Sequence, residues 1–209
     1  GLRDVMDEPA LLAPEWKRKN VLPALEDLYD DIWVYGLPQI CDPLADISLP
    51  ASVREKMVFT GYLRRSLPAV PATPSINMPD GPYVMVTGGG GGDGEKLIEW
   101  VLRGYEWDKT LPHNALLVFG PFMNAERQSE YLERAAALPK VHAITFDAHI
   151  EGLIAHASGL VAMGGYNTFC EILSFDKRAL IVPRRVPRME QYIRAARANS
   201  LGLVNMLLD

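Results

Sequence analysis

From about residue 82 onward, short unbroken apolar segments alternate with helix-length segments that carry an apolar stripe. The apolar segments fall at residues 83–87, 115–119, 141–146, 160–163 and 179–182, and a shorter run follows at Leu203-Val204. Strands buried on both faces read as continuous apolar runs, and parallel strands need long, usually helical connections. The pattern therefore predicts an α/β fold with a doubly wound, mainly parallel Rossmann-like sheet.

The first 80 residues lack this regularity. Proline is frequent there, one helix is expected over residues 21–29, and residues 32–35 and 57–60 are isolated strand candidates. The run from Leu67 to Pro74 contains three prolines in eight residues, which predicts an extended linker. We therefore expect an irregular N-terminal segment before the Rossmann-like domain.

Composition excludes several classes of function. A net charge of −5 and a pI near 5.4 disfavour nucleic-acid binding, which usually needs a basic surface. Two distant cysteines and four histidines without ligand spacing predict neither a structural disulfide nor a metal site. No apolar run reaches the roughly 18–20 residues of a membrane span, and the first residues are not a signal peptide, so we expect a cytoplasmic protein.

A glycine turn follows the fourth apolar segment and precedes a helix. Its sequence is Gly164-Gly165-Tyr166-Asn167-Thr168-Phe169-Cys170-Glu171. Such a turn directs the unpaired N–H groups and the positive dipole end of a helix toward the carboxyl edge of the sheet, which suits an anionic ligand. The structural alternative is a capping box, in which Thr168 caps the helix and Glu171 turns back to the chain.

Positive charge is concentrated just beyond this turn. Residues 177–197 contain one lysine and six arginines but only one acid, Glu190, in a chain whose net charge is negative. This asymmetry favours a phosphate-bearing ligand, and the alternative is a solvated basic face.

Two further loops end at the same predicted sheet edge. Gly88-Gly89-Gly90 begin a glycine-rich loop that lacks both a convincing dinucleotide fingerprint and the G-K-[ST] of a P-loop, so neither NAD binding nor ATP hydrolysis is expected. It allows close approach of a ligand to the backbone, or is a plain turn. The loop Phe146-Asp147-Ala148-His149-Ile150 either borders a nucleobase or contains a helix cap at Asp147.

With these motifs, the chain resembles the C-terminal, nucleotide-sugar-binding half of a MurG-like GT-B glycosyltransferase. The resemblance covers residues 82–206 and depends on Thr87-Gly88-Gly89-Gly90, the turn from Gly164 to Glu171, Ile181-Val182-Pro183 and Glu190-Gln191. It implies that residues 76–209 form the donor-binding domain, and that residues 1–75 are the tail of an N-terminal acceptor domain with its linker. We also expect the chain to be a fragment of a longer protein.

The resemblance further implies a nucleoside-diphosphate sugar as donor, UDP- or TDP-linked, an unidentified hydroxyl acceptor, and no metal or other cofactor. Glu171 would hold the ribose hydroxyls, the turn at residues 164–168 the diphosphate, Glu190 and Gln191 the sugar, and the loop at residues 146–150 the base. Arg188 stands where the family has a histidine. The implied nucleotide-sugar-binding residues are Gly88, Gly89, Gly90, Phe146, His149, Ile150, Gly164, Gly165, Asn167, Thr168, Glu171, Arg188, Glu190 and Gln191.

No residue of this chain is assigned as the catalytic base, because such enzymes usually supply it from the N-terminal domain. That domain would also carry any peripheral membrane association of the full-length protein. Two alternatives stay open. One is a nucleotide-sugar 2-epimerase of the same fold, disfavoured because the turn has a single Glu in place of a Glu-Glu pair. The other is a nucleotide-binding module without catalysis.

Overall fold

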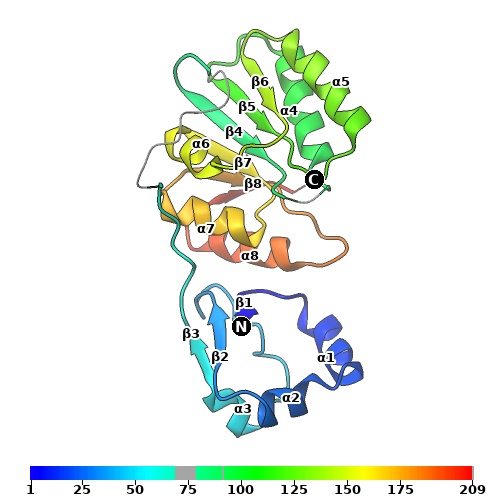
Figure 1. Cartoon of the computed structure of the whole chain (residues 1–209), viewed down its shortest axis with the longest axis vertical. Helices are drawn as coiled ribbons and strands as arrows, with labels where there is room; N and C mark the ends of the chain where they lie inside the picture. The colour runs from blue at the N-terminus through cyan, green and yellow to red at the C-terminus, as the bar shows by residue number, and fades with distance from the viewer. Residues whose placement is uncertain (69–78, 91, 209) are drawn as a thin grey trace. The chain divides into compact units, whose positions relative to one another are not determined.

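The computed structural model describes residues 1–68, 79–90 and 92–208, and its contacts divide the chain into two units (Figure 1). The first unit comprises Gly1–Leu63 and Arg184–Leu203, and the second comprises Arg64–Pro183 and Val204–Asp209. Most of the expected proline-rich linker lies outside the described residues.

A six-stranded, all-parallel sheet forms the second unit, with the strand order β6-β5-β4-β7-β8-β9. Numbered from β4, this is the 3-2-1-4-5-6 order of a doubly wound dinucleotide-binding fold, so the predicted fold class is confirmed. The strands are β4 (Tyr83–Thr87), β5 (Asn114–Val118), β6 (Val141–Ile144), β7 (Gly159–Ala162), β8 (Ala179–Ile181) and β9 (Asn205–Met206). The sixth strand lies two residues beyond the expected Leu203-Val204.

Helices pack on both faces of this sheet (Figure 1). On one face, alternate side chains such as Val86 and Leu117 join a core with apolar residues of α4 and α5. Residues of opposite parity, such as Met85 and Leu116, are fully buried on the other face. The helices of this unit are α4 (Glu95–Trp107), α5 (Ala125–Ala136), α6 (Ile150–His156) and α7 (Tyr166–Ser174).

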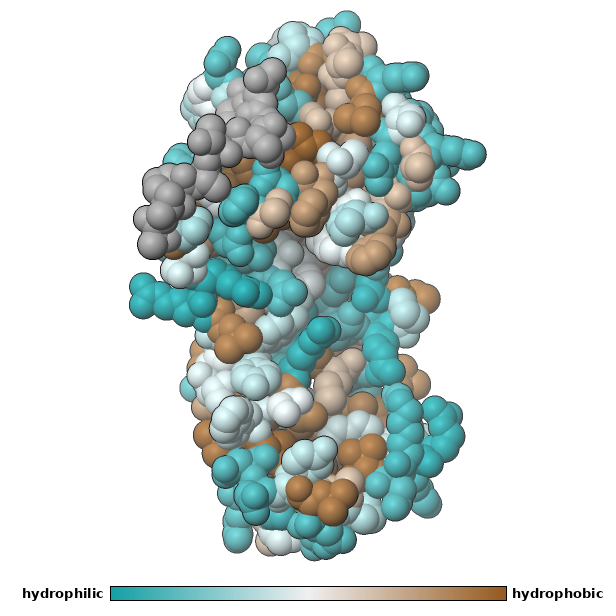
Figure 2. All heavy atoms as spheres, in the orientation of Figure 1, coloured by the Kyte–Doolittle hydropathy of each residue, from teal (hydrophilic) through white to brown (hydrophobic). Residues whose placement is uncertain are grey.

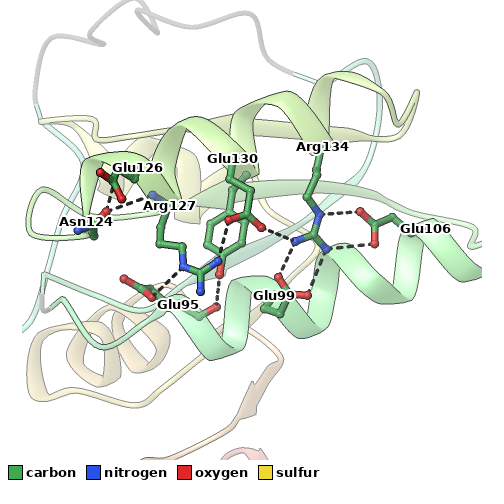
Figure 3. A network of polar contacts seen from close by, with 9 residues as sticks. Glu95, Glu99, Glu106, Asn124, Glu126, Arg127, Glu130 and Arg134 are labelled. Atoms are coloured by element: carbon green, nitrogen blue, oxygen red, sulfur yellow. Dashed lines mark hydrogen bonds and ion pairs between the residues drawn. The ribbon is translucent and has the colours of Figure 1, made fainter.

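An ion-pair network joins α4 to α5 on the solvent side (Figure 3). Arg134 of α5 contacts three carboxylates, those of Glu99, Glu106 and Glu130. The hydrogen bond from Arg134 lowers the pKa of Glu106. The network holds the two helices in register above a shared apolar core.

The first unit is more regular than the sequence indicated. Its strands β1 (Leu2–Arg3), β2 (Ile32–Tyr35) and β3 (Met57–Phe59) form a parallel sheet in the order β1-β2-β3, so the two strand candidates pair with each other. Its helices are α1 (Pro9–Arg18), α2 (Val21–Asp27), α3 (Ala51–Glu55) and α8 (Glu190–Ser200). Helix α2 lies within the range expected for a helix, residues 21–29, whereas α1 and α3 were not predicted. Helix α1 begins at Pro9, and a proline in the first helical turn loses no helical hydrogen bond.

A buried ion pair connects α8 to the first residues of the chain within this unit. Arg194, 1% exposed, donates from Nε and Nη2 to the two carboxylate oxygens of Asp4, both at 2.7 Å. The Tyr62 hydroxyl donates to Asp4 Oδ2 at 2.7 Å. A bidentate pair with a further donor offsets much of the cost of burying both charges.

On the face drawn in Figure 2, apolar residues are scattered among polar ones. Exposed large side chains include Trp33 and Val58 of the first unit and Trp107 and Phe122 of the second. Among the described residues, no helix combines the length and apolarity that crossing a membrane requires.

Candidate functional site: the carboxyl edge of the six-stranded sheet

Two glycine turns meet where the strand order of the second unit reverses. β4 and β7 are neighbours, with Thr87 opposite Ala162, so the turns that follow them start side by side at the carboxyl edge. Doubly wound folds bind their ligands at such a switch point, where the chain leaves neighbouring strands toward opposite faces of the sheet. A Cβ built on Gly89 would lie 3.7 Å from Thr168 Oγ1, which places the first loop against the start of α7.

The second turn requires glycine at Gly164. Its φ is +77°, and a Cβ there would lie 2.7 Å from Ile181 Cγ2 of β8. Gly165 is the N-cap of α7 and has no side chain to cap the helix, which begins at Tyr166. Thr168 is therefore already the third helical residue, and the capping-box interpretation of Thr168 and Glu171 is wrong.

The start of α7 is suited to an anion. No side chain caps it, and its first turn contains no acidic residue. The other helices of this unit, α4, α5 and α6, each have a glutamate in the first turn that partly neutralises the dipole. At α7 the positive dipole end keeps no such counter-charge.

Glu171 lies on the buried side of α7 and is only 7% exposed. Burial raises the pKa of its carboxyl from 4.5 to about 7, with Arg65 lowering it and Glu151 of α6 raising it further. Among the described residues, the carboxylate receives no hydrogen bond. Glu171 is thus a carboxylate with unused acceptor positions beside an anion-attracting helix start.

Arg65 brings a positive charge to the same place. Its Nη2 donates to Asn167 Oδ1 at 3.3 Å, and its main-chain N–H donates to Ser174 Oγ at 2.8 Å. Its Nε is buried and has no hydrogen-bond partner within the described part of the chain. Arg65 was not among the predicted site residues, although the Arg64-Arg65 pair ahead of a proline-rich run was a visible signal.

The expected base-binding loop follows β6, the edge strand beyond β5. Asp147, 6% exposed, accepts from the His149 N–H through Oδ1 at 2.6 Å, and His149 is the N-cap of α6. The expected N-cap at Asp147 is therefore wrong, because its side chain closes a local turn before the helix starts. Phe146 is 57% exposed, and Ile150 begins α6, which contacts α7.

The remaining predicted residues belong to the first unit. Arg188 pairs with Glu15 at 3.1 Å and with Asp7 at 3.5 Å. Glu190 Oε1 accepts from Arg184 at 2.8 Å, while its Oε2 is buried and lacks a hydrogen-bond partner among the described residues.

Gln191 is 6% exposed and accepts the Arg184 main-chain N–H through Oε1 at 3.1 Å. Arg184 and Arg188 are thus engaged with carboxylates of their own unit. Within the second unit, the start of α7 and Arg65 are the candidate anion-binding groups at the glycine turn.

Comparison with known sequences identifies the family. The profile of the glycosyltransferase family 28 C-terminal domain matches residues 83–209, more than half of the chain. The chain belongs to glycosyltransferase family 28. The match covers all six strands of the second unit and both glycine turns. No curated protein sequence matches the chain.

Solved structures show that this family 28 chain shares the GT-B fold. CalG4, the calicheamicin glycosyltransferase, is similar with a TM-score of 0.59 and 16% identity over 95% of this chain and 46% of its own. MurG of Acinetobacter baumannii is similar with a TM-score of 0.57 and 14% identity, over 87% of this chain and 47% of its own. VinC in complex with DTDP is similar with a TM-score of 0.57 and 19% identity, over 85% of this chain and 39% of its own.

The chain thus spans about half the length of these structures or less. The expected resemblance to the C-terminal half of MurG-like GT-B glycosyltransferases is confirmed.

Proposed function

We propose that this chain binds a nucleoside-diphosphate sugar and is the donor-binding half of a glycosyltransferase. The observation that carries the proposal is the start of α7, which has neither a side-chain cap nor an acid in its first turn and lies at the switch point beside Arg65 and Glu171. Membership of family 28 supports the same reaction class.

In this proposal the diphosphate binds at the turn of Gly164, Gly165 and Thr168, where main-chain N–H groups and the helix dipole attract negative charge. Arg65 adds a guanidinium whose Nε has no hydrogen-bond partner among the described residues. Gly88, Gly89 and Gly90 let the neighbouring backbone approach the ligand, and Gly89 borders Thr168.

Glu171 accepts hydrogen bonds from the two ribose hydroxyls, and this role explains a buried carboxylate without hydrogen-bond donors. Two hydroxyl donors from one ribose would satisfy both carboxylate oxygens. The loop containing Phe146, His149 and Ile150 borders the base. Because the charge of Glu151 at the start of α6 acts on Glu171, this end of the loop lies within electrostatic reach of the ribose position.

Glu190, Gln191 and Arg188 are proposed contacts of the donor sugar. The buried Oε2 of Glu190 lacks a hydrogen-bond partner among the described residues, which supports a role as an acceptor in the proposed site. Gln191 retains its amide N–H groups, since its contact with Arg184 uses the oxygen. Arg188 is the weakest of the three, because two carboxylates already engage it.

We propose a UDP- or TDP-linked hexosyl donor, and the DTDP bound to the similar structure VinC supports the second choice. Transfer would invert the anomeric centre, with the acceptor hydroxyl attacking as the diphosphate leaves. The general base would come from outside this chain, so we expect the chain alone to bind donor without transferring sugar. A cytoplasmic location and peripheral membrane association of a longer protein are part of the same proposal.

Isothermal titration calorimetry of the whole chain with UDP-, TDP- and GDP-linked glucose tests donor binding. We expect binding of the UDP or TDP sugar, and a Glu171→Ala variant should weaken it ten- to a hundredfold, the scale of one charge-assisted hydrogen bond. Glu133→Ala, at an exposed position of α5, is the matched control. If a folded chain binds none of the three, the proposal is wrong.

Catalysis distinguishes the remaining candidates. Conversion of a UDP-sugar to its 2-epimer by the chain alone would favour the epimerase. Tight donor binding with no transfer, even when the chain is supplied with an acceptor half, would favour a binding module.

A further inference from the structure

Three polar side chains of α7 form one stripe along the helix. Asn167, Glu171 and Ser174 are spaced four and three residues apart, so they lie on the same side of the helix. Asn167 and Ser174 are separated by about 10 Å along the axis. Glu171 lies between them.

Arg65 is attached to both ends of this stripe. Its main-chain N–H donates to Ser174 at the C-terminal end of α7, and its guanidinium donates to Asn167 in the first turn. The arginine side chain therefore runs alongside α7 from Ser174 toward the helix start and passes the position of Glu171. The charge effect of Arg65 on Glu171 agrees with this path.

The main-chain bond is the anchor of this arrangement. The residues flanking Arg65, which are Arg64, Ser66 and Leu67, are exposed. Within the described residues, Arg65 makes hydrogen bonds only to Ser174 and Asn167. The Asn167 contact, at 3.3 Å between neutral and charged groups, cannot by itself fix a side chain as long as arginine.

We infer that Ser174 is a positioning residue of the proposed donor site: its hydroxyl fixes the main chain at Arg65 and so holds the guanidinium beside Asn167 and Glu171. The inference rests on the proposed function for its ligand, a nucleoside-diphosphate sugar. The claim that the Ser174 hydroxyl sets the charge environment of Glu171 through Arg65 can be tested without ligand.

Two charged groups act on the Glu171 carboxyl: Arg65, from the segment that precedes β4, and Glu151 of α6. If Arg65 moves away, burial and Glu151 act on the carboxyl without an opposing cation, and its pKa rises. Replacement of Ser174 should therefore change the titration of a residue that it does not touch. A role in helix stability alone would leave that titration unchanged.

The experiment follows the Glu171 carboxyl by ¹³C NMR through a pH titration of the ligand-free chain. We expect a higher midpoint in Ser174→Ala, a similar rise in Arg65→Gln, and the wild-type midpoint in Ser174→Thr, which keeps the hydroxyl. Ser129→Ala is the matched control, because the Ser129 hydroxyl bonds only to the Ala125 carbonyl within α5. An unchanged midpoint in Ser174→Ala would overturn the inference.

Calorimetry with UDP- or TDP-glucose provides the second measurement. Ser174→Ala should weaken binding about three- to tenfold, as expected for one lost hydrogen bond. In the Arg65→Gln background the same substitution should have no further effect, and a full additional loss there would contradict positioning through Arg65. If the wild type binds neither sugar, the proposed function fails, while the NMR titration still decides the role of Ser174.

Discussion

Replacing Glu171 with glutamine should stabilise the protein in a pH-dependent way. The carboxyl titrates near 4.5 in an unfolded chain and at about 7 when folded. Between these values the folded state holds a proton that the unfolded state has lost, so the stability of the wild type falls as the pH rises. Glutamine is nearly isosteric and does not titrate, so the variant avoids this loss.

The size of the effect follows from the pKa change. Each pH unit between about 5 and 7 should add about 1.4 kcal/mol to the advantage of Glu171→Gln, up to about 3 kcal/mol above pH 7. Well below pH 4.5 the Glu171 carboxyl is protonated in the folded and in the unfolded protein. The difference in unfolding free energy between wild type and Glu171→Gln should then be constant. The cause is burial: the side chain is 7% exposed and receives no hydrogen bond from the described residues.

Differential scanning calorimetry at half-unit steps from pH 4.5 to 8 measures this difference and resolves the two units if they unfold separately. Glu133→Gln, exposed on α5, is the control and should show no comparable pH dependence. A constant difference between wild type and Glu171→Gln across this range would refute the reasoning. It would mean that Glu171 is ionised and well solvated in the folded protein.

Three other substitutions test the fold around the site. Gly164→Ala should lower the free energy of unfolding by about 2 kcal/mol, because it combines a φ of +77° with a 2.7 Å contact to a β8 side chain. A Cβ at Gly165 meets nothing within 4 Å, so Gly165→Ala should cost less than half as much. Urea unfolding of the two variants measures the difference. Asp4→Asn should cost about 3–5 kcal/mol in thermal unfolding, because it leaves the buried Arg194 charge unpaired, and a loss below 1 kcal/mol would contradict that pairing. Arg134→Gln should cost about 1–2 kcal/mol at pH 7, and the loss should shrink at acid pH, because Arg134 lowers the pKa of Glu106 and protonation removes that ion pair; a loss independent of pH would exclude the ion pairs as its cause.

The second unit could be predicted because each of its signals is local. Five of its six strands coincide with short, mainly apolar runs, and three of them are followed within two residues by glycine, so the order of strands and helices follows from the sequence. The parallel pairing follows from the length of the connections. The adjacency of Gly89 and Thr168 depends also on the strand order, which comes from the structure.

Two helix caps were assigned to the wrong residue for a common reason. Thr168 and Asp147 are both good cap residues, and the sequence alone favoured them as caps. At α7, glycines at positions 164 and 165 complete the turn early, and the helix starts at Tyr166. At α6, the Asp147 side chain closes a turn at His149 instead. Residue type predicts which side chains can cap a helix. Where the helix starts depends on how the turn after the preceding strand closes.

The pairing of Arg65 with Ser174 could not have been found from local patterns. They are 109 positions apart, and their bond joins a main-chain N–H to a hydroxyl, a contact with no periodicity and little constraint on residue type. Buried pairs such as Asp4 and Arg194, 190 positions apart, have the same character. Long-range polar contacts depend on tertiary placement, which hydrophobic pattern fixes only coarsely.

Stability and ligand binding are linked at Glu171. A site that raises the pKa of a carboxyl to about 7 stores a destabilisation that a pair of ribose hydroxyls would relieve, because hydrogen bonds to the ionised form lower its pKa. Binding of a nucleotide sugar should then release a proton near neutral pH, and affinity should rise about tenfold per pH unit up to about 7 and level off above it. A nucleotide sugar is the appropriate probe, since its diphosphate is esterified at both ends, whereas a free terminal phosphate titrates near pH 6. In the Glu171→Gln variant, affinity should be lower and independent of pH. A variant that is stabilised at pH 8 yet binds with wild-type affinity would separate the two roles and leave the burial of Glu171 without a functional reason.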